Sequence, residues 1–189
     1  MTTGKAKATS GGNSAAKSSS PKSRKPWVTG LLFAVGVLFW TSLQYALGYW
    51  LPPQSLLQWI NITVASHVAL VCRIFDPDLV RTAAIITSQG FSIEVIFECT
   101  GAFTMFILNG MILSWPSPWI RKIIGVVGGC AVLYFFNLAR MSTLVFVGAR
   151  WPQNFDTFHK YFWQATFIAV VLLCWFVWLE WFSGNGRKV

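Results

Sequence analysis

The sequence predicts an all-α polytopic membrane protein with about four transmembrane helices, an additional helix at the outer membrane interface and a small extracytoplasmic β-hairpin. The first observation behind this prediction is composition. Hydrophobic residues make up 54% of the 189 residues and charged residues only 11%, whereas a soluble domain carries about 25% charged residues. The second observation is a set of long uncharged runs, and the third is the placement of basic residues between them. Together these features indicate a chain folded in a lipid bilayer.

Four apolar runs supply the predicted transmembrane helices: residues 27–50, 99–120, 123–149 and 161–179. Each is long enough, or nearly so, to cross a hydrocarbon core of about 30 Å, and the third is interrupted only by Arg140. The first run is longer than the apolar part of a secretory signal, and no small-residue cleavage site follows it. We therefore interpret it as a retained anchor.

The basic residues orient these helices. Residues 1–26 combine Ser, Gly, Ala and Thr with six Lys and Arg residues, which predicts a disordered basic cytoplasmic tail. Residues 27–183 form the predicted membrane domain, and residues 184–189 form a short basic cytoplasmic tail. Since basic residues beside spans favour the cytoplasm, Arg121 and Lys122 also belong inside. The net charge of +9 is therefore an orientation signal, and no nucleic-acid partner is expected.

This orientation determines how the segment between the first two spans is interpreted. With Arg121 inside, the chain between residues 50 and 99 must begin and end outside. An additional crossing by the apolar residues 59–75 would put Cys99 inside and Arg121 outside. We therefore predict that residues 59–75 form an outer-interface or re-entrant helix.

Residues 81–98 predict the β-hairpin. Two β-rich runs flank Ser88-Gln89-Gly90, a plausible hairpin loop. In the second run apolar and mainly polar positions alternate with period two, as expected for a hairpin with one wet face. The apolar positions are Phe91, Ile93, Val95 and Phe97, and the alternating positions are Ser92, Glu94, Ile96 and Glu98.

Three chemically active side chains are predicted at one membrane depth. Cys99 stands where the hairpin enters the second span, and His159 stands just before the fourth. Arg140 lies about 26 Å along the third span from Ile123, at about 1.5 Å per residue, which is close to the outer end of that span. Residues far apart in the sequence are therefore expected to meet at the outer membrane face.

Cys99 has two interpretations that its neighbours leave open. It can be a small buried packing residue, or a nucleophile whose thiolate is favoured by the free N–H groups at a helix start. Gly101 permits close approach of another backbone. The carboxylate of Glu98 acts in the other direction, because a neighbouring negative charge disfavours a thiolate.

Arg140 also has two interpretations. Its guanidinium either reaches toward the lipid headgroups or faces the protein interior and acts there. Asn137 lies one turn earlier on the same face and offers a second donor to an oxyanion. Alternatively, Glu94 or Glu98 pairs with Arg140 as part of the structure.

His159 is either a member of an aromatic interface belt or a general acid–base whose imidazole is oriented by Asp156, one turn earlier. The His and Cys residues show no metal-ligand spacing, so no metal and no cofactor is expected. A nucleophile, a proton carrier and an oxyanion donor at one depth together indicate acyl transfer.

The motifs around these residues are similar to those of a known family. "ECTG" at residues 98–101, "NLAR" at residues 137–140 and His159 before the last helix resemble the Cys, Arg and His signatures of exosortases and archaeosortases. The resemblance covers roughly residues 27–182, and the "FECTG" and "WQ" contexts are most similar to exosortase H. Many members carry Ser where this chain has Thr100.

The resemblance implies a cysteine transpeptidase of the bacterial plasma membrane that processes exported proteins at the outer face. Its substrates would carry a C-terminal sorting signal made of a short motif, a transmembrane helix and a basic cluster. By similarity Cys99 is the nucleophile, and Arg140 and His159 complete a triad. The resulting thioester would pass to water, or to an amine or hydroxyl of a lipid or glycan acceptor. The supporting or substrate-binding residues are Asn137, Glu98, Thr100, Asp156 and Glu94.

Other classes of protein remain as alternatives. The main one is a non-catalytic membrane scaffold or substrate-binding subunit of an export system, and the second is a simple cysteine protease that transfers its substrate to water. A transporter is disfavoured, because no helix is interrupted at mid-depth beside a charged residue. Gly125 and Gly129, spaced as Gly-x-x-x-Gly, predict close helix packing, either internal or with the substrate.

Overall fold

The computed structural model describes residues 26–50 and 54–181. Apart from Pro26, the predicted basic tails at residues 1–26 and 184–189 lie outside the described residues. The helices are α1 (Pro26–Trp50), α2 (Gln54–Cys72), α3 (Ala102–Ser114), α4 (Trp119–Arg150), α5 (Phe155–Thr157) and α6 (Trp163–Trp181), with short helical turns at η1 (Phe97–Thr100), η2 (Pro152–Asn154) and η3 (Phe158–Phe162).

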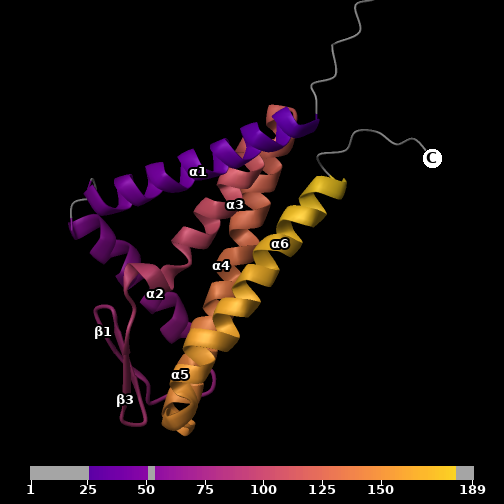
Figure 1. The fold of residues 1–189 in the computed structure, drawn as a ribbon. Coiled ribbons are helices and arrows are strands. Elements are labelled where there is room, and N and C mark those ends of the chain that lie inside the picture. Colours follow the sequence, from indigo (N-terminus) through magenta and orange to yellow (C-terminus); the bar gives the residue numbers. More distant parts are fainter. Residues whose placement is uncertain (1–25, 51–53, 182–189) are drawn as a thin grey trace, which may run out of the picture.

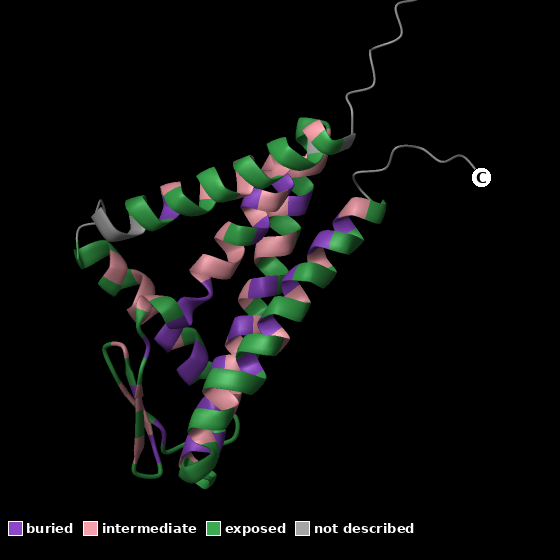
Figure 2. Cartoon of the chain, viewed as in Figure 1, coloured by how far each residue is buried: buried purple, intermediate pink, exposed green. Residues whose placement is uncertain are grey.

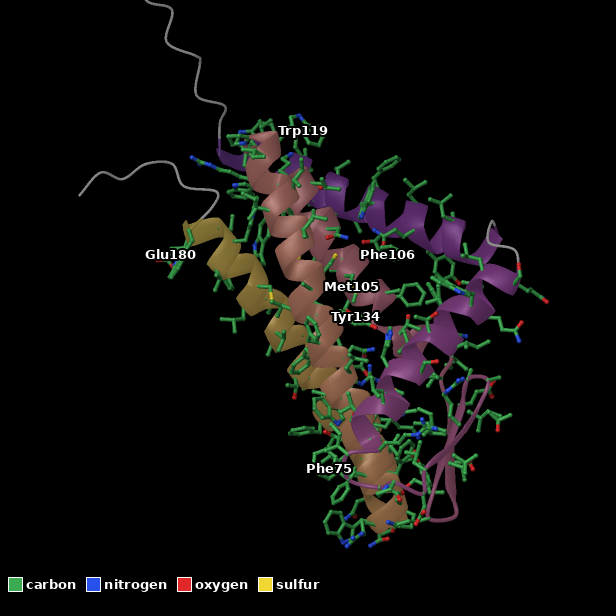
Figure 3. All side chains as sticks on the ribbon, turned by 180° about the vertical axis from the view of Figure 1, so that it is seen from behind. Phe75, Met105, Phe106, Trp119, Tyr134 and Glu180 are labelled. Atoms are coloured by element: carbon green, nitrogen blue, oxygen red, sulfur yellow. The ribbon has the colours of Figure 1, made fainter. Side chains whose placement is uncertain are left out.

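Helices α4 and α6 run side by side along the long axis of the molecule, and α3 packs against both (Figure 1). Helix α1 lies along α3, while α2 runs toward the β-sheet, so that α1 and α2 diverge like the arms of a V. Figure 3 places Trp119 and Glu180 at one end of the molecule and Phe75 toward the other. The start of α4 and the end of α6 therefore lie at the same end of the molecule.

Within the described residues, four helical segments are long and apolar enough to cross a membrane: Gly30–Leu47, Gln54–Cys72, Trp119–Arg150 and Pro152–Trp181. Large apolar side chains are exposed on the outward faces of α1, α4 and α6, as lipid-facing helices require because lipid tails are as apolar as these side chains. The predicted polytopic membrane fold is confirmed.

The set of spans differs from the predicted set at α3. This helix has 13 residues, which gives it about 20 Å against a hydrocarbon core of about 30 Å. It begins after η1 and ends before Pro116 and Pro118, which cannot continue a helix. By length and composition α2 qualifies as a span and α3 does not, although the sequence predicts an interfacial helix at residues 59–75 and a span at residues 99–120.

The hairpin prediction is confirmed, with one additional strand. β1 (Val80–Thr82), β2 (Ile85–Ser88) and β3 (Phe91–Glu94) form an antiparallel sheet in the order β1-β2-β3. Ser88 pairs with Phe91 across Gln89 and Gly90, which both have positive φ, as a tight hairpin turn needs. The first predicted β-run is divided at Ala83, where φ is 53°.

The predicted alternation also holds through and beyond β3. The residues that face the protein are buried or half-buried, and the residues between them are exposed. The first set is Phe91, Ile93, Val95 and Phe97, and the second is Ser92, Glu94, Ile96 and Glu98.

Two clusters of buried side chains hold the elements together. The first, called here the sheet-side core, joins α2, the sheet, η1, α4 and the start of α6. It contains Val64, Ala65, Val68, Ala69, Cys72, Leu79, Ile86, Val95, Cys99, Met141, Leu144, Val145 and Trp163. The second, called the helical core, joins α3, α4 and α6. It contains Leu108, Ile112, Leu133, Phe167, Val171, Trp175 and Trp178.

The two cores meet on α4 near Asn137 and Arg140. Leu133 belongs to the helical core, and Met141 belongs to the sheet-side core. Phe136, between them, packs against both. Figure 2 shows the buried residues along the seam of α4 and α6, at η1 and at the sheet-side end of α2.

The two glycines spaced as Gly-x-x-x-Gly on α4 allow close packing inside the protein. A Cβ atom at Gly125 would stand 2.2 Å from Nε1 of Trp178 on α6, and one at Gly129 would stand 2.6 Å from Cδ2 of Leu108 on α3. The Trp178 indole is also held by a hydrogen bond to the Arg121 carbonyl. The internal form of the prediction is therefore the one observed.

A matched pair of substitutions tests this packing. We expect Gly125→Ala to lower the free energy of unfolding of the detergent-solubilised protein by about 1–3 kcal/mol, the usual cost of overpacking, and with it the unfolding temperature. The reason is that the rigid indole of Trp178 cannot move aside. Gly128→Ala is the control, since no atom lies within 4 Å of its added Cβ and alanine favours the helix. Equal unfolding temperatures for the two variants would contradict the close contact.

Candidate active site

Cys99 lies in a short turn between the sheet and α3. β3 leads through Val95 and Ile96 into η1, where the Cys99 N–H donates to the Ile96 carbonyl at 2.9 Å. Thr100 strengthens this turn, because its hydroxyl donates to the Phe97 carbonyl at 2.6 Å. The sequence predicts Cys99 at the start of the second span. In the structure Cys99 lies in η1, three residues before α3 begins at Ala102.

Asn137 holds the Cys99 turn against α4. The Asn137 Nδ2 group donates to the Cys99 carbonyl at 3.0 Å, and the Asn137 side chain is fully buried. Gly101 follows with φ of 78°, and a Cβ there would stand 3.2 Å from Cγ of Asn137. The sequence suggested that Gly101 permits the approach of another backbone. In the structure Gly101 instead permits the approach of the Asn137 side chain. The amide donor expected to serve an oxyanion is engaged with Cys99 itself.

Burial of Cys99 favours the neutral thiol, whereas the positive charge of Arg140 favours the thiolate. Cys99 is 8% exposed, and burial raises the pKa of its thiol above the ordinary value. The positive charge of Arg140 and a backbone hydrogen bond at Ile96 lower this pKa, while the negative charge of Glu98 adds to the rise. Burial is therefore the largest influence on the Cys99 pKa, and it favours the neutral thiol.

Arg140 faces the protein interior. Its guanidinium lies over the ring of Phe167 on α6, 5.3 Å from the centroid, and its buried Nε has no hydrogen-bond partner in the described protein. Its charge acts on Cys99 on one side and on His159 on the other. Of the two interpretations, the interior one fits this placement.

His159 lies in the π-helical turn η3 and stacks on Phe155, with 5.5 Å between ring centroids. Asp156, expected to orient the imidazole, instead forms an ion pair with Lys160 at 3.1 Å. No hydrogen bond joins Asp156 to His159 among the described residues. The two side chains interact through charge alone.

The two predicted acidic partners of Arg140 lie elsewhere. Glu98 and Glu94 are both exposed, and within the described ranges neither forms an ion pair with Arg140. Glu94 lines a separate hollow of about 360 Å³ between α2 and the sheet. The alternation of β3 turns both carboxylates toward solvent, away from the side on which α4 packs.

The remaining cysteines and His67 are accounted for by packing. All four cysteines are free thiols, and Cys72 is buried in the sheet-side core. Cys130 contacts the amide of Asn109 at 3.5 Å, and His67 forms a hydrogen bond with the Tyr134 hydroxyl. Within residues 26–50 and 54–181, no group of three or more His, Cys, Asp and Glu residues could hold a metal ion.

One residue beside the site was not predicted. Trp163 is 8% exposed and belongs to the same core cluster as Cys99 and Met141. The sequence signal was present, because Trp163 opens the "WQ" motif and follows His159 by four residues. In a chain with 11 tryptophans, however, the sequence does not separate this indole from those that face lipid.

Cys99, Arg140 and His159 therefore come from η1, α4 and η3 of a helical membrane protein. A protein-family model described as "Transmembrane exosortase (Exosortase_EpsH)" matches residues 26–177. The chain therefore belongs to the transmembrane exosortase family, a family of cysteine transpeptidases with a general role in protein sorting. It is a multi-pass membrane protein. Searches of curated proteins and of solved structures found no significant match.

The charges around Cys99 predict how its reactivity depends on pH. Thiol alkylation requires the thiolate, so the Cys99 rate should rise as the pH increases through a raised pKa. Glu98→Gln removes a charge that raises this pKa and should move the midpoint to lower pH, with faster alkylation at pH 7. Arg140→Gln removes the opposing charge and should move it to higher pH. Mass spectrometry of the Cys99 peptide separates this thiol from the other three.

Glu94→Gln is the control for that experiment, because Glu94 is also exposed and does not contribute to the Cys99 pKa. Identical pH profiles for Glu98→Gln and Glu94→Gln would contradict the electrostatic description of the site.

The Asn137 contact predicts a local stability effect. Asn137→Leu leaves the Cys99 carbonyl without its buried donor. We therefore expect the free energy of unfolding to fall by about 1–3 kcal/mol and amide hydrogen exchange at residues 97–102 to become faster. Asn109→Leu is the control, since Asn109 is only half-buried and contacts a thiol. Unchanged exchange in the Asn137 variant would exclude the hydrogen bond as the anchor of this turn.

Proposed function

We propose that this protein cleaves the C-terminal sorting signal of exported proteins through a Cys99 thioester and transfers the new C-terminus to an acceptor. The observation that carries this proposal is the inward placement of Arg140 on α4. Its guanidinium lies over the Phe167 ring, and it follows Asn137, the donor to the Cys99 carbonyl, by three residues on the same helix. Cys99, Arg140 and His159 come from η1, α4 and η3, and packing of the two cores brings the elements together.

In the proposed orientation the sheet, η1 and η3 face the exterior and the starts of α1 and α4 face the cytoplasm. Arg121 and Lys122, at the start of α4, support this orientation because basic residues favour the cytoplasmic side. The exposed acidic residues Glu94, Glu98 and Asp156 lie in the opposite part of the molecule. The substrate helix would enter the membrane beside the four helical segments, with its motif next to η1 and the sheet.

The first half of the reaction forms the thioester. The Cys99 thiol loses its proton to His159, and the sulfur attacks the scissile carbonyl carbon. A C–S bond forms while the carbonyl π electrons move to oxygen, and Arg140 stabilises the oxyanion. When the C=O bond re-forms, the C–N bond breaks and His159 donates its proton to the leaving amine.

The second half of the reaction regenerates the enzyme. An acceptor amine, hydroxyl or water loses a proton to His159 and attacks the thioester carbonyl. Collapse of this second tetrahedral intermediate breaks the C–S bond, and Cys99 leaves as a thiolate that takes the proton back from His159. Arg140 lowers the pKa of Cys99 and therefore also improves it as a leaving group.

Substitution of Cys99 tests this function directly. We expect Cys99→Ala to abolish processing of a co-expressed exported protein that ends in a motif, a transmembrane helix and a basic cluster. Intact-mass spectrometry of that substrate measures both cleavage and the group added to the new C-terminus. Cys72→Ala is the control, because Cys72 is another buried free cysteine of the sheet-side core.

Processing at the wild-type level in Cys99→Ala would overturn the nucleophile assignment and favour the scaffold alternative. A cleaved substrate that carries only a new carboxylate would identify the enzyme as a hydrolase. A defined added mass would identify the acceptor.

A further inference from the structure

Buried polar atoms without partners concentrate around Cys99. Seven side-chain nitrogen or oxygen atoms in the described ranges are buried and form no hydrogen bond. Three of these seven belong to Asn137, Arg140 and Trp163. Asn137 donates to the Cys99 carbonyl, the charge of Arg140 acts on Cys99, and Trp163 shares a buried cluster with Cys99. Two of the three atoms, Nε of Arg140 and Nε1 of Trp163, can act only as donors.

Trp163 is packed close to the part of α4 that carries the site residues. It belongs to the same buried cluster as Cys99 and Met141, the sheet-side core, and its ring meets that of Phe136 on α4 edge-on, with 5.7 Å between the ring centroids. Phe167, one helical turn further along α6, carries the Arg140 guanidinium on its face. The indole is therefore positioned beside the same part of α4 that presents Arg140.

The π-helical turn η3 connects Trp163 to His159. The backbone N–H of Trp163 donates to the Phe158 carbonyl five residues earlier, so the helix is locally widened between the His159 and Trp163 side chains. π-Turns of this kind occur frequently at functional sites, because the additional residue changes the direction of the side chains on either side. His159 and Trp163 belong to this one irregular turn, next to regular α6.

An indole N–H buried without an acceptor is unfavourable by about 1–3 kcal/mol. An apolar side chain would occupy these surroundings without that penalty. The donor is therefore best explained by an acceptor that is present during the reaction and absent from the free protein.

We propose that Trp163 is a further catalytic residue, whose Nε1–H donates a hydrogen bond to the oxygen of the scissile carbonyl as it becomes an oxyanion. Trp163 and Arg140 then supply two donors from α6 and α4, while Asn137 holds the Cys99 turn. Two donors are a common requirement for an oxyanion hole, because the developing charge has more than one lone pair to stabilise. The inference rests on the proposed acyl transfer and extends it by one named residue.

The alternative is that Trp163 only fills space. The chain provides a comparison, because Trp40 on α1 also has a buried Nε1 without a partner. Trp40 packs against Gly110 of α3 and is not a member of the buried cluster that contains Cys99. If unpaired indoles were merely tolerated in this protein, Trp40 and Trp163 would respond alike to substitution.

The test compares Trp163→Phe with Trp40→Phe in the full chain, reconstituted with the sorting-signal substrate. We expect Trp163→Phe to lower kcat by about 100-fold, the usual effect of losing one oxyanion donor, with KM unchanged. Its unfolding temperature should stay close to that of the wild type, because removal of the unsatisfied donor stabilises the variant while the smaller ring destabilises it. Trp40→Phe should retain the wild-type kcat.

A second variant separates hydrogen bonding from shape. Benzothienylalanine at position 163 keeps the bicyclic ring and replaces the N–H by sulfur, so it should match Trp163→Phe in its low kcat. Wild-type kcat with this residue would overturn the proposal, as would an unchanged kcat or a purely KM effect in Trp163→Phe. The proposed function fails separately, if the wild-type protein itself does not cleave the substrate.

Discussion

The packing of both cores against one long helix, α4, is the constraint on which the site depends. α4 has 32 residues, about 48 Å at 1.5 Å per residue, which exceeds a hydrocarbon core of about 30 Å. This length allows α4 to take part in both cores. Its first part packs in the helical core with α3 and α6, and its last part packs in the sheet-side core with α2 and the sheet. Asn137 and Arg140 lie where one core gives way to the other.

This junction explains how polar side chains are accommodated in so apolar a chain. The Asn137 amide donates a hydrogen bond to the Cys99 carbonyl, and the Arg140 guanidinium packs on the face of the Phe167 ring. Burial of the Cys99 thiol raises its pKa, and Arg140 opposes that rise. Arg140 thus offsets part of the effect of burial on the Cys99 pKa, and in the proposed reaction the same cation would stabilise the oxyanion.

Local patterns predicted the local elements well. The alternation along residues 91–98 and the Gln89-Gly90 turn are properties of neighbouring residues, and both appear as expected. Span boundaries were less predictable, because a window of apolar residues does not reveal that η1 would take Cys99 out of the helix or that two prolines would stop α3 early. The spacing predicted that Asp156 orients His159, but its carboxylate forms an ion pair with Lys160 instead.

The sequence by itself determined the membrane class, the hairpin and the three residues that resemble an exosortase site, since composition, period and motif are all written along the chain. Only the tertiary structure decided that Asn137 contacts Cys99, that Glu98 points away from Arg140 and that Trp163 joins the site. The physical reason is that these relations depend on how α4 and α6 rotate against each other and against η1. That rotation is determined by the packing of two separate cores.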